Sequence, residues 1–114
     1  MTTIYHNPRC SKSRQTLELL RANGVEPDIA LYLENPLDAQ TIGALLGKLG
    51  LGAEKLVRRS EQDFKDNNLG RADITEEQLI AAMVKYPKLI ERPIVVSGDR
   101  AVLGRPPENV LELL

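Results

Sequence analysis

The sequence has 114 residues, a length that favours one domain with one hydrophobic core over two. Apolar residues make up 42% and charged residues 27%, close to the average of soluble globular proteins, which argues against a disordered chain. The formal net charge of −1 gives no general attraction for nucleic acid or for an anionic membrane. No apolar run approaches the roughly 18 residues of a membrane-spanning helix. We therefore predict a single domain over residues 1–114 that binds neither nucleic acid nor membrane.

The N-terminus and the cysteine count indicate the cellular compartment. The first residues, Met-Thr-Thr-Ile-Tyr, lack the basic and apolar blocks of a signal peptide. Cys10 is the only cysteine, so no disulfide can form within the chain, and a reducing compartment suits it. We expect a cytoplasmic protein.

The first third of the chain predicts a β-α-β unit. Residues 2–6 alternate and are rich in β-formers, and the turn residues 7–9 follow them. Residues 11–23 predict a helix with Leu17 and Leu20 on one face and Gly24 as its stop. Residues 25–31 predict a second strand. Two strands joined by a helix within about 30 residues favour a parallel pair with a right-handed crossover.

After a break at Asn35-Pro36, the middle of the chain predicts helices. The strongest pattern follows Asp38 as N-cap and repeats apolar residues at i, i+3, i+4 and i+7, namely Ile42, Leu45, Leu46 and Leu49. Residues 53–57 predict a short helix, whereas the polar residues 60–73 are ambiguous. Residues 75–78 form a capping-box sequence, which opens a further helix that stops before Pro87.

The last third predicts a hairpin and a final helix. Residues 94–97 and 101–104 flank Gly98-Asp99-Arg100, and a helix runs from Pro106 or Pro107 to Leu114. The chain order is then β-α-β, a helical insertion and β-β-α. We predict an α/β fold with a thioredoxin-like mixed sheet, against which the helices pack.

Cys10 stands between the first strand and the first helix. A lone cysteine is more often a small buried hydrophobe than a nucleophile. Here, however, the start of a helix favours an anion, and His6, Arg9, Lys12 and Arg14 lie within four residues of the thiol. Lowering its pKa from about 8.5 to 6.5 requires about 2.7 kcal/mol, of which a helix terminus supplies roughly 0.3–1 kcal/mol. Nearby cations or hydrogen bonds must supply the rest, and the neighbours favour an activated thiolate. His6 has two interpretations, thiol tuning or packing.

The residues after the thiol, Cys10-Ser11-Lys12-Ser13, have the outline of a C-x-x-C redox motif with serine in the second position. Any resolving thiol must therefore come from another molecule. The sequence does not carry the phosphatase-like loop C-x5-R, because position 16 is threonine.

Three arginines lie at breaks between predicted elements: Arg58, Arg92 and Arg105. A guanidinium fork matches a tetrahedral oxyanion, so these are candidate substrate-binding residues, whereas Arg59 is expected to face solvent. Pro93 is a candidate cis proline. In a thioredoxin-type fold a cis proline at this place faces the active thiol and would direct Arg92 toward it. We predict no metal site.

Five segments together resemble a known family, the glutaredoxin-coupled arsenate reductases or ArsC family: residues 4–14, 56–58, 91–96, 104–106 and 110–114. The resemblance covers nearly the whole chain. It implies that Cys10 attacks arsenate, that Arg58, Arg92 and Arg105 hold the oxyanion and product, and that His6 tunes the thiol. It further implies glutathione as co-substrate, a glutaredoxin partner that completes the reduction, no bound cofactor and a monomer.

Two departures bear on the branch of the family. The sequence stops soon after Leu111, without the C-terminal extension of longer plasmid-type members, and it has Ser-Lys-Ser where some of those members have Gly-Thr-Ser. Both suit a compact chromosomal-type member, which need not reduce arsenate efficiently.

Two alternatives stay open. One is a regulatory protein of the Spx type that contacts RNA polymerase, although Ser13 removes the usual C-x-x-C switch. The other is a glutathione-dependent thiol oxidoreductase without arsenate activity.

Overall fold

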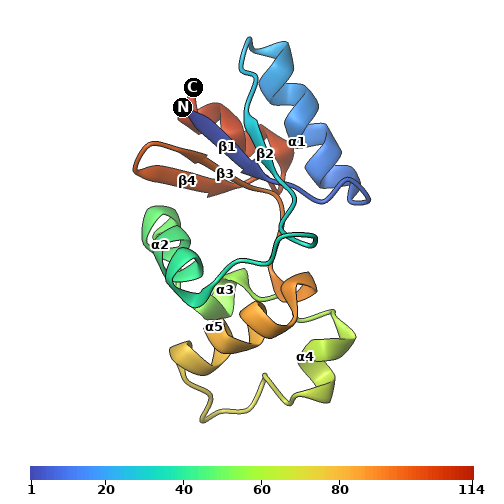
Figure 1. Cartoon of the computed structure of the whole chain (residues 1–114), viewed down its shortest axis with the longest axis vertical. Coiled ribbons are helices and arrows are strands. Elements are labelled where there is room, and N and C mark those ends of the chain that lie inside the picture. The colour runs from blue at the N-terminus through green and yellow to red at the C-terminus, as the bar shows by residue number, and fades with distance from the viewer. The chain divides into compact units, whose positions relative to one another are not determined.

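The computed structural model describes all residues, 1–114, and the chain forms two compact units. The sheet unit comprises Met1–Asn35 and Arg92–Leu114, and the helical unit comprises Pro36–Glu91 (Figure 1). None of the helices has both the length and the apolar character needed to cross a membrane. The single domain over residues 1–114 stays a prediction.

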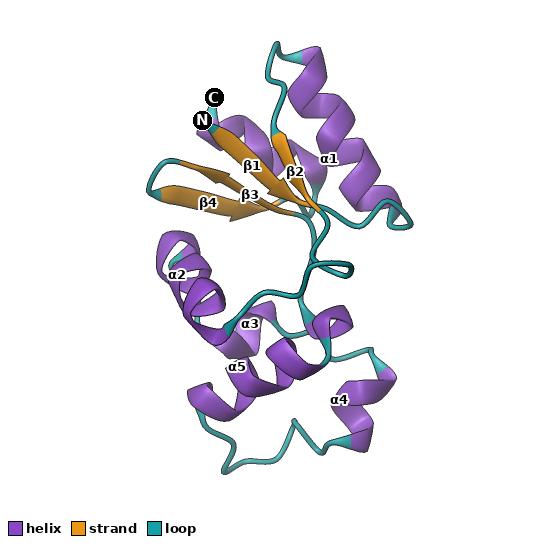
Figure 2. Ribbon diagram, viewed as in Figure 1, coloured by secondary structure: helices purple, strands orange, loops and turns teal.

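The sheet unit contains four strands: β1 (Thr2–Tyr5), β2 (Asp28–Ala30), β3 (Ile94–Ser97) and β4 (Arg100–Leu103) (Figure 2). Their order is β2-β1-β3-β4. β1 runs parallel to β2 and antiparallel to β3, and β4 is antiparallel to β3. The predicted mixed sheet is therefore confirmed. The second strand is shorter than predicted, since only three residue pairs join β1 and β2, from Thr3–Asp28 to Tyr5–Ala30.

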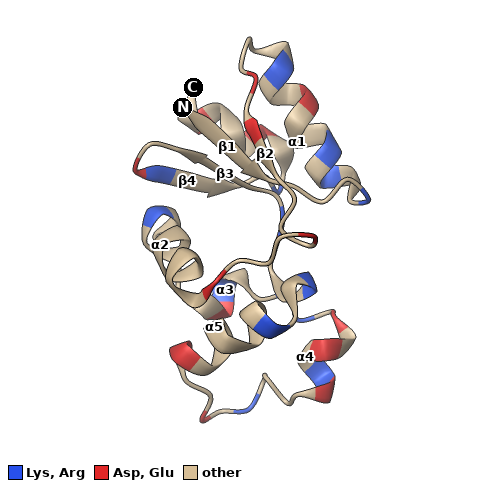
Figure 3. Ribbon diagram, viewed as in Figure 1, with Lys and Arg blue, Asp and Glu red and all other residues tan.

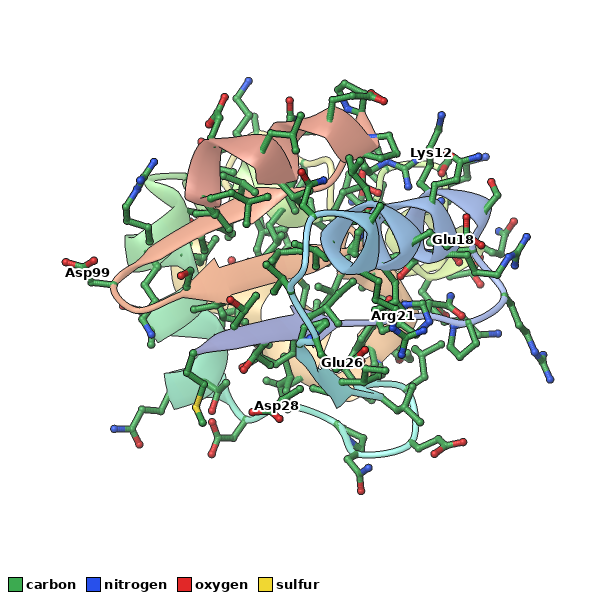
Figure 4. All side chains as sticks on the ribbon, turned by 90° about the horizontal axis from the view of Figure 1, so that it is seen from above. Lys12, Glu18, Arg21, Glu26, Asp28 and Asp99 are labelled. Atoms are coloured by element: carbon green, nitrogen blue, oxygen red, sulfur yellow. The ribbon has the colours of Figure 1, made fainter.

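Helix α1 (Ser11–Ala22) connects the two parallel strands, and the 3-10 helix η2 (Pro107–Leu113) packs beside it. Their apolar faces and the sheet share one buried cluster, which consists of Ile4, Leu17, Leu20, Val95 and Val110. The predicted face of α1 is thus confirmed. At the end of α1, an ion pair of 3.0 Å joins Arg21 to Glu26 on the way to β2 (Figure 4).

The C-terminal part of the sheet unit differs from expectation in detail. The predicted hairpin forms, but Arg100 belongs to β4 and pairs with Ser97, so the turn is Gly98-Asp99, with Asp99 at its tip (Figure 4). Gly98 has a φ of 64°, a conformation that favours glycine. The predicted final helix forms as a 3-10 helix. Accordingly, Asn109 donates its backbone N–H to the carbonyl three residues before it.

The helical unit contains α2 (Ala39–Leu49), α3 (Ala53–Leu56), α4 (Gln62–Asp66), α5 (Glu76–Lys85) and the 3-10 helix η1 (Pro87–Leu89). The Asp38 cap is confirmed by a 2.8 Å bond from the Thr41 N–H, and the capping box of α5 is present in full. α5 packs against α2, α3 and η1. The ambiguous residues 60–73 include α4, a helix of five residues that sequence periodicity is too short to reveal.

Candidate active site

Cys10 is the N-cap residue of α1 and is half-buried. Its extended backbone, with φ −94° and ψ 122°, ends the loop that follows β1. The Cys10 N–H donates to the Asn7 carbonyl at 3.0 Å, and its carbonyl accepts the first helical bond from Arg14 at 3.0 Å. This position places the thiol where the unpaired N–H groups of the first helical turn point. Basic residues also gather at this end of α1 (Figure 3).

The pKa of the Cys10 thiol is the result of opposing effects. Burial raises the pKa. The Ser13 backbone N–H, a hydrogen bond from the Arg92 side chain, the Lys12 backbone N–H and the positive charge of Arg92 all lower it. The net result is a pKa below the usual thiol value. The helix start and one arginine thus act together to favour the thiolate.

The sheet register explains how distant residues reach this thiol. Tyr5, the last residue of β1, pairs with Ile94 at the start of β3, and Ile94 pairs with Leu103 at the end of β4. Three connecting segments, around residues 6–10, 92–93 and 104–106, therefore leave the sheet at the same end. The Arg105 Nη1 lies 3.8 Å from the Cys10 Sγ.

The backbone around the two arginines has unusual features. The Arg92–Pro93 peptide bond is cis, and so is Arg105–Pro106. The Arg105 Nη1 also donates to the Arg92 carbonyl at 3.1 Å, so the two arginine segments are joined directly. The geometry places both guanidinium groups in the surroundings of one sulfur.

Gly104 allows the last of these segments to approach α1 closely. A Cβ atom at this position would lie 2.5 Å from the Thr16 Oγ1 and 2.8 Å from the Pro93 Cγ. Thr16 is fully buried, and its hydroxyl donates to the Lys12 carbonyl at 2.8 Å and lies 3.3 Å from the Gly104 carbonyl. The Gly104 N–H donates to the Pro93 carbonyl at 2.9 Å. Any larger residue here would displace the chain that positions Arg105.

His6 contacts α1 through Ser13. The His6 Nδ1 lies 2.6 Å from the Ser13 Oγ, which also accepts a 3.1 Å bond from the Asn7 N–H. Burial lowers the pKa of His6, as do the charges of Arg14 and Arg21, so the neutral ring is favoured. The Ser13 hydroxyl can then donate to Nδ1 while it accepts from Asn7. The role of His6 in tuning the pKa of the thiol stays a prediction, and its hydrogen bond with Ser13 is the contact through which His6 would act.

Ser13 contributes more to the site than its place in the C-x-x-S outline predicts. Its side chain is completely buried, and its backbone N–H lowers the pKa of the thiol. Its position in the sequence indicates this role. Ser13 is the third residue of a helix whose N-cap is Cys10, and the backbone N–H at this position points at the side chain of the N-cap residue.

Arg58 belongs to the helical unit. Its Nη1 lies 2.6 Å from the Glu91 Oε1, and its Nε lies 3.4 Å from the Glu61 Oε2. Arg59 is exposed, as predicted, and its guanidinium lies 5.4 Å from the centre of the Phe64 ring. The structure thus brings together Cys10 and two of the three predicted arginines, while the role of Arg58 at the oxyanion stays a prediction.

The mixed sheet, the thiol at the first helix and the cis proline before β3 define a protein of thioredoxin-like fold, and the pKa of its one cysteine is lowered. The model of the ArsC family matches residues 5–113, so the chain belongs to the ArsC family. The resemblance read from the five sequence segments is confirmed.

Individual relatives cover nearly the whole chain. YfgD of Escherichia coli (strain K12), described as uncharacterised, is 57% identical over 112 residues, which are 97% of this chain and 94% of YfgD. An arsenate reductase of Haemophilus influenzae is 44% identical over 112 residues, which are 97% of each chain. The solved structure of an arsenate reductase from Vibrio cholerae superposes with a TM-score of 0.97 at 46% identity and covers 99% of this chain and 97% of that one.

The acidity of the thiol can be measured directly. The rate of iodoacetamide labelling of Cys10 against pH is expected to have its midpoint below about 8.5, the value of an ordinary thiol. The physical reason is the set of donors that favour the thiolate, chief among them the Ser13 N–H and the Arg92 side chain. In Arg92→Gln the midpoint should move upward. A wild-type midpoint at or above about 8.5 would assign Cys10 a packing role instead.

Proposed function

We propose that this protein is an arsenate reductase that converts arsenate to arsenite with Cys10 as its single nucleophile and with glutathione and a glutaredoxin as reductants. One observation carries the proposal: the guanidinium of Arg105 lies 3.8 Å from a thiol whose pKa is lowered. Nucleophilic attack on a tetrahedral oxyanion requires a thiolate and a group that binds the oxyanion, and both must lie close together. Arsenate reductases among the relatives support the choice of oxyanion.

In the proposed reaction, the Cys10 thiolate bonds to arsenic and one arsenate oxygen leaves as water after protonation. A glutathione thiolate then bonds to the same arsenic, and a second oxygen leaves as water after protonation. A glutaredoxin thiolate attacks the glutathione sulfur, so a mixed disulfide forms, and the bond between the glutathione sulfur and arsenic breaks with its electron pair left on arsenic. Hydrolysis of the remaining sulfur–arsenic bond releases arsenite and restores Cys10. Two external thiols are oxidised for each arsenate that is reduced, which balances the electrons.

The roles of the other residues follow from their contacts. Arg92 and Arg105 would hold arsenate oxygens beside the thiol, and Arg105 is in turn fixed by its bond to the Arg92 carbonyl. The family resemblance assigns Arg58 to the oxyanion as well, and this residue carries an ion pair with Glu91. His6 would act through the buried Ser13 hydroxyl, which fixes the first turn of α1. A reducing cytoplasm suits a cycle that depends on free thiols.

The test is production of arsenite from arsenate by the purified protein with glutathione, glutaredoxin, glutathione reductase and NADPH. We expect one arsenite for each NADPH oxidised, because each arsenate takes two electrons. Arsenic speciation and absorbance at 340 nm measure the two quantities independently. NADPH oxidation without arsenite would indicate thiol reduction of another kind, and the absence of both would refute the proposed activity.

A further inference from the structure

A pocket of about 280 Å³ lies in the sheet unit, beside the loop that carries the thiol. One wall is formed by residues 6–9, which lead directly to Cys10, and the other by Leu31, Leu33 and Glu34 after β2. Its volume is just below the range of about 300–1,000 Å³ that is usual for small-molecule sites. It suits part of a ligand of tripeptide size rather than a large cofactor.

The first wall is held by bonds from several directions. The Arg9 N–H donates to the Asn7 Oδ1 at 3.0 Å, and the Arg14 Nη1 donates to the Pro8 carbonyl at 2.8 Å. The Asn7 carbonyl also accepts from the Cys10 N–H at 3.0 Å. These bonds fix the loop up to Arg9, and a ligand in the pocket would therefore contact the residue that directly precedes Cys10.

The second wall is also pre-formed, since Glu34 and Asn35 both donate their N–H groups to the Leu31 carbonyl, at 3.0 and 2.9 Å. Binding of a ligand would then cost little conformational entropy, because both walls are already ordered. This favours a binding function for the pocket over an incidental gap between mobile loops.

The chemistry of the lining indicates the kind of ligand. Pro8, Leu31 and Leu33 provide apolar surface, while Arg9 and Glu34 provide exposed charges of opposite sign. Neither charge is engaged in an ion pair within the chain. A pocket lined by apolar surface, one cation and one anion complements a small molecule that carries both an ammonium and a carboxylate, such as a short peptide.

We propose that this pocket binds the peptide part of a small thiol reductant of the glutathione type and presents its sulfur at the site of Cys10. The inference rests on the proposed function, because that reaction needs a second thiol. A chain with one cysteine cannot supply this thiol itself. Arg9 binds a carboxylate of the ligand, and Glu34 binds its ammonium group.

The test is binding of S-methylglutathione to the full-length Cys10→Ser protein, followed by NMR. Neither partner then carries a reactive thiol, so only non-covalent binding is measured. The methyl signals of Leu31 and Leu33 are expected to shift in a saturable way. Arg9→Gln and Glu34→Gln, each added to this variant, should raise Kd about two- to fivefold, the range of an exposed ion pair.

Matched controls separate this pocket from general attraction by the basic start of α1. Lys12→Gln removes an exposed cation that does not line the pocket, and Glu18→Gln removes an exposed carboxylate on the same helix. Neither should change Kd. With the diethyl ester of S-methylglutathione, the effect of Arg9→Gln should vanish while that of Glu34→Gln remains.

The outcomes distinguish this proposal from the proposed function. Shifts of Leu31 and Leu33 in a protein that does not reduce arsenate would support the pocket and refute the activity. Arsenate reduction without these shifts, or with an equal effect of Lys12→Gln and Arg9→Gln, would refute the pocket and leave the activity standing.

Discussion

Replacement of Cys10 by serine is expected to abolish arsenite production. A serine hydroxyl does not ionise under conditions in which this thiol does, and no second cysteine can take its place. The donors that lower the pKa of the thiol, the Ser13 and Lys12 N–H groups and the Arg92 side chain, would then have no anion to stabilise. The measurement is arsenic speciation after incubation with the complete glutathione and glutaredoxin system.

The matched control for this experiment is Ser11→Ala. Ser11 is exposed and follows the thiol directly, so its replacement leaves the nucleophile and the first helical turn in place. It should keep most of the activity, and circular dichroism should show that both variants are folded. Arsenite production by Cys10→Ser above the protein-free background would exclude Cys10 as the nucleophile.

Conservative replacement of the arginines near the thiol is expected to have the second-largest effect. Arg92→Lys and Arg105→Lys keep the charge but lose the planar fork that binds two oxygens at once. A hydrogen bond to a charged group contributes about 1.5–3 kcal/mol, so each variant should lose about 10- to 100-fold in kcat/KM for arsenate. Arg105→Lys also removes the bond to the Arg92 carbonyl, which adds to its loss.

The neighbouring arginine of the helical unit provides the control. Arg59 is exposed and its guanidinium faces the Phe64 ring, a contact that lysine can also make. Arg59→Lys should therefore change kcat/KM by less than about twofold. If Arg92→Lys and Arg59→Lys behave alike, the assignment of Arg92 to the oxyanion is wrong.

Local sequence rules were sufficient for most of the elements. The Asp38 cap, the capping box at Thr75 and the turn at Gly98 each depend on residues within three positions of one another. The same is true of the position of Cys10 at a helix start. Such features can be read without knowing the rest of the fold, whereas the five-residue α4 is too short to show a period.

The parts of the site that depend on distant pairing could not be derived in this way. Cys10 and Arg105 are 95 residues apart, and they meet because Tyr5, Ile94 and Leu103 share a register across three strands. The sequence contains no local signal for that register, so the arginines acquired meaning only through the family resemblance. The pocket beside the thiol loop has no local sequence signal either, because its two walls come from separate segments.

The most direct test of a single-thiol mechanism is to exchange the source of thiols for the wild-type protein. Because Cys10 is the only cysteine, the cycle cannot end in an internal disulfide, which is the substrate that thioredoxin usually reduces. We predict sustained arsenite production with glutathione and glutaredoxin, and a stall when glutathione alone is withheld. Sustained production with thioredoxin, thioredoxin reductase and NADPH as the only thiol source would contradict the mechanism.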